Sequence, residues 1–141
     1  VKLERHNNGG MTTDEAFRGN PYDPGAIETC STIAWIDMSV LMLRMTANSI
    51  VADEIELSTL NSVAGFYSPS GRWVTYNTPM DGVRNLFKMN HNWQALRGTP
   101  EFNCCSANAP RGFGQISDWA IMIVQCTQAV RPVNRLRAWA K

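Results

Sequence analysis

The strongest constraint on the fold is a long apolar segment with a helical period, from about residue 28 to about residue 52. Its apolar residues recur at steps of three and four, the spacing that gathers side chains on one face of a helix. These residues are Ile33, Ile36, Val40, Leu43, Ala47, Ile50 and Val51. Leu41, Met42 and Met45 widen the apolar surface beyond a single stripe. A helix that is apolar almost all round is typical of a buried position, so we expect packing on more than one side.

Two further helices are predicted from weaker patterns. A shorter one is expected over residues 53–63, because Asp53 and Glu54 suit a helix N-terminus. Another is expected from Asn108, as the N-cap, to about residue 130. Pro110 would then lie in the first turn, where its missing N–H does no harm.

The rest of the chain carries turn signals. Aromatic and β-branched residues flank the sequence SPSG at residues 68–71, which favours a β-hairpin. We expect residues 1–27 and the tail 131–141 to be irregular, and residues 77–103 to be loop with one short helix near 82–89. The predicted fold is mainly α, with two long buried helices and a small β-hairpin. It is either a single domain over residues 1–141 or a fragment of a larger one.

The composition argues against several classes of function. The chain has 141 residues, 44% of them hydrophobic, which suffices for one core. Its net charge is +1 and 18% of its residues are charged, so we expect no bulk attraction to nucleic acid or membrane. Asp37 and Arg44 interrupt the most apolar run, so no transmembrane helix is expected. The first residues hold neither a signal-peptide core nor an initiator Met, so we expect a start in mid-protein. A missing signal then leaves the compartment open, with a cytoplasmic location favoured.

The four cysteines have more than one interpretation. Cys30 follows Glu28 by two residues, and in an extended segment two such side chains point the same way. Cys104 and Cys105 are adjacent and lie near a predicted helix start. Glu28 and these three cysteines would make four donors for one zinc ion, although the spacing is not that of a zinc ribbon or finger. The alternatives are that the cysteines are small buried residues, or that they form disulfides.

Four sequence blocks resemble glycoside hydrolase family 127, the bacterial group typified by β-L-arabinofuranosidase. They are GGMTTDEAF, IETC, GRWVTYNTPMDG and NCCSANAPRG, in the family's order, and the resemblance extends over most of residues 7–125. The resemblance implies an (α/α)6 barrel, of which this chain would be a fragment. It also implies hydrolysis of an arabinofuranoside-like glycan. The tail from residue 125 onward does not resemble the family, and the segment from Asp14 to Cys30 looks slightly compressed.

The resemblance also implies roles for individual residues. Glu28, Cys30, Cys104 and Cys105 would bind zinc, and Cys104 would be the catalytic nucleophile. Glu15 in the DEAF block would be the general acid/base. Such a pair suits a retaining glycosidase, provided that the thiol is kept ionised. Cys126 matches no motif, and we expect it in the core.

Three hypotheses for function stay open. The first is a retaining glycosidase module that acts as part of a larger chain or a homo-oligomer, and it leaves open whether the isolated chain is active. The second is a non-enzymatic zinc-binding or helical interaction module, a remnant of the family. The third is a plain helical domain without metal.

Other residues are ambiguous in the same way. Trp73 and Tyr76 are candidates for sugar stacking or for the core. Arg111 is a candidate for a substrate hydroxyl or for an ion pair, and Asp81 for a turn or for catalysis.

Overall fold

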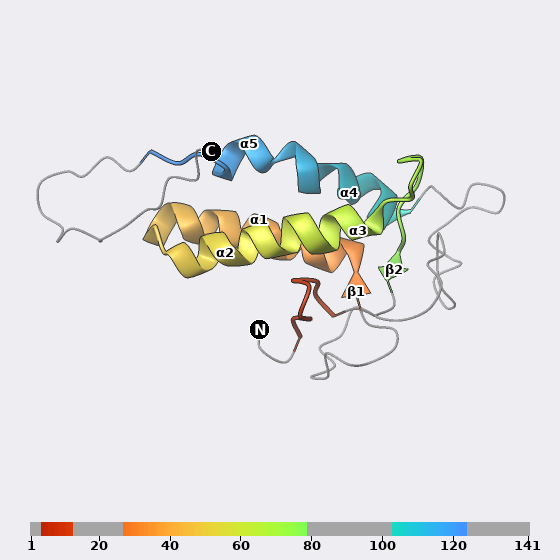
Figure 1. Ribbon diagram of the computed structural model, residues 1–141, viewed down its shortest axis with the longest axis horizontal. Helices are drawn as coiled ribbons and strands as arrows, with labels where there is room; N and C mark the ends of the chain where they lie inside the picture. The colour runs from red at the N-terminus through yellow and green to blue at the C-terminus, as the bar shows by residue number, and fades with distance from the viewer. Residues whose placement is uncertain (1–3, 13–26, 79–102, 124–141) are drawn as a thin grey trace, which may run out of the picture.

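The computed structural model describes residues 4–12, 27–78 and 103–123 of the chain (Figure 1). Its elements are β1 (Ile27–Glu28), α1 (Thr29–Thr46), α2 (Ser49–Leu57), the π-helix η1 (Ser58–Val63), α3 (Ala64–Phe66), β2 (Asn77–Thr78), α4 (Cys104–Gly114) and α5 (Ile116–Trp119). Helix α1 packs against α2 on one side and against α4 on another, and η1 contacts both α1 and α4. The described part of the chain is mainly helical, as the sequence predicts.

The long apolar segment forms two helices rather than one. Ala47 ends α1 in the left-handed conformation, with φ of 50°, and its N–H donates to the Leu43 carbonyl over 2.8 Å. Asn48 then caps α2, because its Oδ1 accepts from the Ile50 N–H over 3.0 Å. The prediction of one helix over 28–52 is therefore wrong at its C-terminal end. Capping by Asn48 outweighs the continuous apolar period.

The second predicted helix is longer than residues 53–63. It begins at Ser49 and continues through the π-helix η1 into α3, which ends at Phe66. The wider π-helical turn buries Ser58, Thr59, Ser62 and Val63 against the rest of the molecule. The local sequence gave no signal for this change of helix type.

The core lies between α1, the α2–η1 segment and α4. Its buried apolar residues include Ile33, Ile36, Val40, Leu43, Ile55, Val63, Phe66 and Ala109. Gly112 permits the close approach of α4, since a Cβ there would lie 2.6 Å from Val63 Cγ1 and 2.7 Å from Ile33 Cδ1. The residue that fixes this packing distance is therefore one with no side chain.

The turn at SPSG joins two short extended segments. Tyr67 and Val74 form an antiparallel bridge, and the Thr75 N–H donates to the Phe66 carbonyl over 2.9 Å. Gly71, with φ of 69°, takes the left-handed conformation that favours glycine. The predicted hairpin is present in this reduced form. The two-residue strand β2 that follows it pairs antiparallel with β1, in the register Ile27 to Thr78. The turn region is thereby tied to the start of α1.

The N-cap of helix α4 lies five residues before the predicted one. Asn103 is the N-cap, and its Oδ1 accepts from the Ser106 N–H over 3.0 Å. The prediction of Asn108 as N-cap is wrong, and Pro110 lies inside the helix rather than in its first turn. The helix also ends earlier than predicted: α4 stops at Gly114, α5 stops at Trp119, and residues 120–123 are not helical. Asn103 and Asn108 are both competent caps, and the upstream one makes the two cysteines the first residues of the helix.

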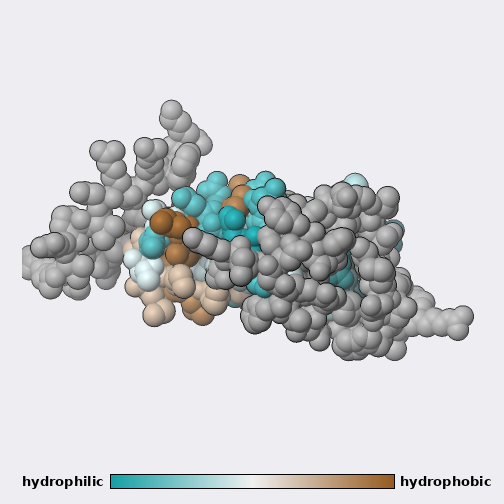
Figure 2. Space-filling view, turned by 90° about the horizontal axis from the view of Figure 1, so that it is seen from below, coloured by the Kyte–Doolittle hydropathy of each residue, from teal (hydrophilic) through white to brown (hydrophobic). Residues whose placement is uncertain are grey.

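The outer face of α1 is not covered by the described residues. Met38, Leu41, Met42 and Met45 are all exposed. Figure 2 shows hydrophobic residues gathered at the end of the molecule where α1 gives way to α2. The prediction of packing on several sides of α1 thus holds only in part. Within the described ranges, no helix combines the length and apolar character of a membrane span.

Candidate metal centre

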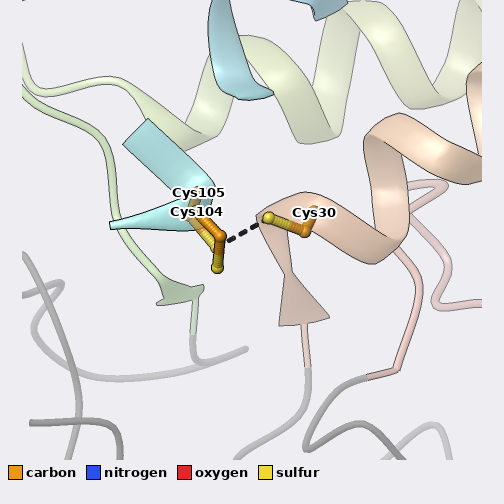
Figure 3. Close-up of side chains that lie close together, drawn as sticks. All are labelled: Cys30, Cys104 and Cys105. Atoms are coloured by element: carbon orange, nitrogen blue, oxygen red, sulfur yellow. Dashed lines mark hydrogen bonds between the residues drawn. The ribbon is translucent and has the colours of Figure 1, made fainter. Parts of the chain in front are cut away.

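Two helix N-termini bring three cysteines together. Cys30 is the second residue of α1, and Cys104 and Cys105 are the first two of α4. Their Sγ atoms all lie within 4.8 Å of one another. Cys30 Sγ is 3.3 Å from Cys105 Sγ, which is 3.9 Å from Cys104 Sγ (Figure 3). Residues 74 or more positions apart in the chain thus form one cluster of sulfur donors, which we call the thiol cluster.

Hydrogen bonds from distant segments hold the first turn of α1. The Thr29 N–H donates to the Tyr76 carbonyl over 3.1 Å, and Thr29 Oγ1 donates to the Thr75 carbonyl over 2.7 Å. Thr32 Oγ1 donates to the Glu28 carbonyl over 2.9 Å and accepts from the Met11 N–H over 3.0 Å. Thr29 and Thr32 are both fully buried. Each of their polar contacts fixes the position of the neighbouring Cys30.

The first turn of α4 is held from the same side. Asn103 caps it, and Cys105 is fully buried with its Sγ 3.9 Å from the Tyr76 carbonyl oxygen. Cys104 is the exposed member of the pair and Cys30 is half-buried. All three are thiols rather than disulfides, so the disulfide interpretation is wrong for them.

The contacts within the thiol cluster favour the thiolate form of one cysteine. Hydrogen bonding with the Cys105 thiol lowers the pKa of Cys30 to about 7, against the opposing effect of burial. The pKa of Cys105 is raised by the same contact with Cys30 and by burial. Burial also raises the pKa of Cys104. The first turns of α1 and α4 contain no acidic residue, and the positive end of a helix dipole stabilises a thiolate.

Glu28, the fourth predicted ligand, lies close by but outside the cluster. It is buried in β1, where it precedes the first residue of α1. Its charge raises the pKa of Cys30 and of Tyr76, which places it within electrostatic range of both. Among the described residues, however, the group of donors within 4.8 Å of one another consists of the three sulfurs alone. The structure therefore brings together three of the four predicted ligands.

The three sulfurs fit the geometry of a metal ion. Zinc binds thiolate at about 2.3 Å, so two sulfurs of a tetrahedral site lie about 3.8 Å apart. The Cys30–Cys105 and Cys104–Cys105 sulfur distances, 3.3 and 3.9 Å, lie on either side of that value. The thiol cluster can therefore hold a metal ion through one face of a tetrahedron and leave a fourth position for another donor.

Sequence reasoning missed the roles of two side chains, Asn108 beside the cluster and Asp37 two helical turns from Cys30. Asn108 Nδ2 lies 3.6 Å from Cys30 Sγ, and Asn108 Oδ1 accepts from Arg111 Nη1 over 3.1 Å. Asp37 forms an ion pair with Arg111, which bears out the ion-pair interpretation of that arginine. The available signal was the spacing of Cys104, Asn108 and Arg111, which places them on one face of a helix that starts at Cys104.

Other candidate residues fall into two groups. Tyr76 is fully buried, so its core interpretation is confirmed. Residues 1–3, 13–26, 79–102 and 124–141 lie outside the described residues, and with them Glu15, Asp81, Cys126 and the predicted helix near 82–89.

A family comparison shows which catalytic domain the chain is similar to. Residues 5–118 match the model of the β-L-arabinofuranosidase GH127 catalytic domain. The chain belongs to this family. The match spans both segments that supply the thiol cluster. The mainly helical architecture of the chain is consistent with a part of the family's (α/α)6 barrel. It stops before the C-terminal segment that shows no resemblance to the family. No curated protein and no solved structure matches the chain in the corresponding comparisons.

Proposed function

We propose that this chain is the catalytic part of a retaining glycoside hydrolase of the β-L-arabinofuranosidase type, with Cys104 as the nucleophile. The observation that supports the proposal is the convergence of three Sγ atoms within 4.8 Å, in a chain of the GH127 family. The substrate class is an arabinofuranoside-like glycan. Walls for its pocket would come from the remainder of a longer chain or from a second copy.

Zinc is the proposed metal. Cys30, Cys104 and Cys105 would hold it, with Glu28 as the fourth donor after a change of side-chain position. When bound, zinc keeps its thiol ligands deprotonated at neutral pH and orients their sulfur atoms.

Exposure favours Cys104 over the other two cysteines as the nucleophile. Cys105 is fully buried under the Tyr76 carbonyl, and Cys30 is half-buried beside Asn108. Cys104 is exposed at the first position of α4, where a sugar can approach its sulfur. Burial raises the pKa of Cys104, and a hydrogen bond with Tyr76 acts in the opposite direction by favouring the thiolate.

The proposed reaction has two displacements. Cys104 Sγ attacks the anomeric carbon while Glu15 donates a proton to the departing glycosidic oxygen, so a C–S bond forms and a C–O bond breaks. Glu15 then takes a proton from water, which attacks the same carbon and releases the Cys104 thiolate. Two inversions retain the configuration. The assignment of Glu15 comes from its sequence block.

The test combines metal content with hydrolysis of an aryl β-L-arabinofuranoside. We expect about one zinc per chain, as a single tetrahedral site requires. We also expect Cys104→Ser to lower kcat/KM by at least about 10³-fold, since the nucleophile itself is lost. Cys126→Ser is the matched control, because Cys126 belongs to no proposed site. Absence of zinc, or equal activity in both variants, would contradict the proposal.

A second candidate is a zinc-binding interaction module without catalysis. The exposed apolar residues of α1 favour it, because an uncovered face of this kind suits a binding partner. Bound zinc without any hydrolysis, in an assay that includes the longer chain, would select this candidate.

A further inference from the structure

We propose that Asn108 is a positioning residue for the thiol cluster, and that Arg111 and Asp37 hold its side-chain amide in the one orientation that can donate to Cys30. This inference rests on the proposed function for its purpose, whereas the contacts that carry it are made by the chain's own side chains. The three residues form a relay from the surface to the cluster.

The amide of Asn108 bridges two cysteines. Its Nδ2 lies 2.9 Å from the Cys104 carbonyl oxygen and 3.6 Å from Cys30 Sγ. One NH₂ group thus contacts the backbone of α4 and a side chain of α1 at once. A donor in this position fixes the direction of the Cys30 sulfur relative to Cys104.

Arg111 selects the orientation of that amide. Arg111 Nη1 donates to Asn108 Oδ1 over 3.1 Å. If the amide rotated by half a turn, Oδ1 would face the Cys104 carbonyl, which only accepts, and Nδ2 would face Arg111, which only donates. Both contacts would then be lost. The arginine therefore excludes the orientation in which the amide cannot donate to sulfur.

Asp37 holds the outer end of the relay. Its carboxylate pairs with Arg111 Nη2, and the pair lines an open groove on the surface. Helices α1 and α4 run side by side in the same direction (Figure 1). Asp37 follows Cys30 by seven residues, and Arg111 follows Cys104 by seven, which is two helical turns in each case. The contact between the thiols and the ion pair thus connect the same two helices at points two helical turns apart.

Partners of this kind orient metal ligands in proteins. A hydrogen bond to a ligand atom fixes its direction and its electron density, and its loss typically lowers metal affinity by about 10- to 100-fold. The ion pair itself is partly solvated, with side-chain exposures of 57% for Arg111 and 31% for Asp37. An exposed pair contributes little to folding, so its disruption should change the site more than the fold.

The first test uses the complete 141-residue chain and Co²⁺ as the probe. Asn108→Asp keeps the shape of the side chain but removes its donor, and we expect the affinity for Co²⁺ to fall by about 10- to 100-fold with a shifted sulfur-to-cobalt charge-transfer band. Arg111→Gln and Asp37→Asn should also lower the affinity for Co²⁺, but by a smaller factor. Arg44→Gln, in the last turn of α1, is the control and should leave both readouts unchanged.

A double-mutant cycle separates a relay from independent effects. If Arg111 acts through Asn108, Arg111→Gln should have no further effect in an Asn108→Ala background. Additive effects would overturn the relay.

The second readout needs no metal. In the metal-free chain, brief alkylation and peptide mapping give the ratio of modified Cys30 to modified Cys104. Asn108→Ala should change this ratio by roughly two- to tenfold, the range that one hydrogen bond supports. If Asn108→Ala changes the alkylation ratio but the chain binds neither Co²⁺ nor Zn²⁺, the proposed metal centre is wrong and the positioning role of Asn108 is supported. Normal metal binding with an unchanged ratio and unchanged affinity would overturn the relay alone.

Discussion

The two ends of α1 differ in how they are held. At the N-terminal end, Thr29 and Thr32 are fully buried and hydrogen-bonded to segments that lie far away in the sequence. At the C-terminal end, Leu41 is 58% exposed and Met45 is 85% exposed. The helix is therefore fixed by polar contacts where it carries Cys30, and left open where it carries methionines.

The contacts that place the thiol cluster do not involve the exposed apolar face at the other end of α1. The contacts that place Cys30 come from Met11, Thr75, Tyr76 and Asn108, all within the described residues. None of the exposed methionines takes part in them. We infer that the geometry of the cluster can persist while the far end of α1 gains or loses a neighbour.

The largest effect is expected from the core beneath the helix. Ile36 is fully buried, so Ile36→Ala should lower the free energy of unfolding by about 2–5 kcal/mol through lost burial and a cavity. Met45→Ala, at the open end, should change it by less than about 0.5 kcal/mol. Urea denaturation of both variants checks the contrast. Equal losses would mean that the open face is buried in solution.

A smaller effect is expected from the spacing between α1 and α4. Gly112→Ala would place a methyl group 2.7 Å from Ile33 Cδ1, and we expect a loss of about 1–3 kcal/mol in unfolding free energy from overpacking. Gly114→Ala is the matched control, since nothing lies within 4 Å of its added Cβ. Thermal unfolding of the pair measures the difference. A neutral Gly112→Ala would show that the two helices are not held at this distance.

The reactivity of Cys30, at the N-terminal end of α1, should depend on pH. Its pKa of about 7 lies below the ordinary value of 9.0, so the thiolate form is favoured by folding. The stability that this shift contributes is present above pH 9 and is lost as the pH falls through 7. In the metal-free chain, alkylation of Cys30 should therefore be about tenfold slower at pH 6 than on its plateau. A midpoint near pH 9 would refute the described sulfur contacts.

The smallest effect is expected at the open end itself. Leu41→Lys and Met45→Lys should each change the unfolding free energy by less than about 0.5 kcal/mol in a monomer. Sedimentation of the same variants reports on self-association. A clear fall in the mass of the native species, absent in Arg44→Gln, would identify a second copy of the chain as the cover.

The sequence allowed the general architecture to be predicted, but not the helix ends. The predicted start of α1, at about residue 28, lies within one residue of the observed start at Thr29. Its end at Ala47 was missed, since a good helix former gives no sign of a left-handed turn. Asn108 was misassigned because Asn103 is an equally good cap, and only packing against α1 decides between them.

The thiol cluster was predicted in part. Spacing alone left several interpretations of the cysteines open, and the resemblance between sequence blocks singled out Cys30, Cys104 and Cys105. The distance between Glu28 and the sulfurs could not be predicted, because it depends on the pairing of β1 with β2. The Asp37–Arg111 pair was equally hidden, since it requires the relative register of two helices that lie 74 residues apart.

The carbonyl oxygen of Tyr76 accepts the N–H of Thr29 and also touches the sulfur of Cys105. A single backbone atom thus serves as the common reference for both halves of the thiol cluster. Lengthening the loop at its tip, around Ser70, leaves that reference in place, whereas one residue inserted between Trp73 and Tyr76 would displace both halves together. Length variation should therefore be tolerated on one side of Trp73 and rejected on the other.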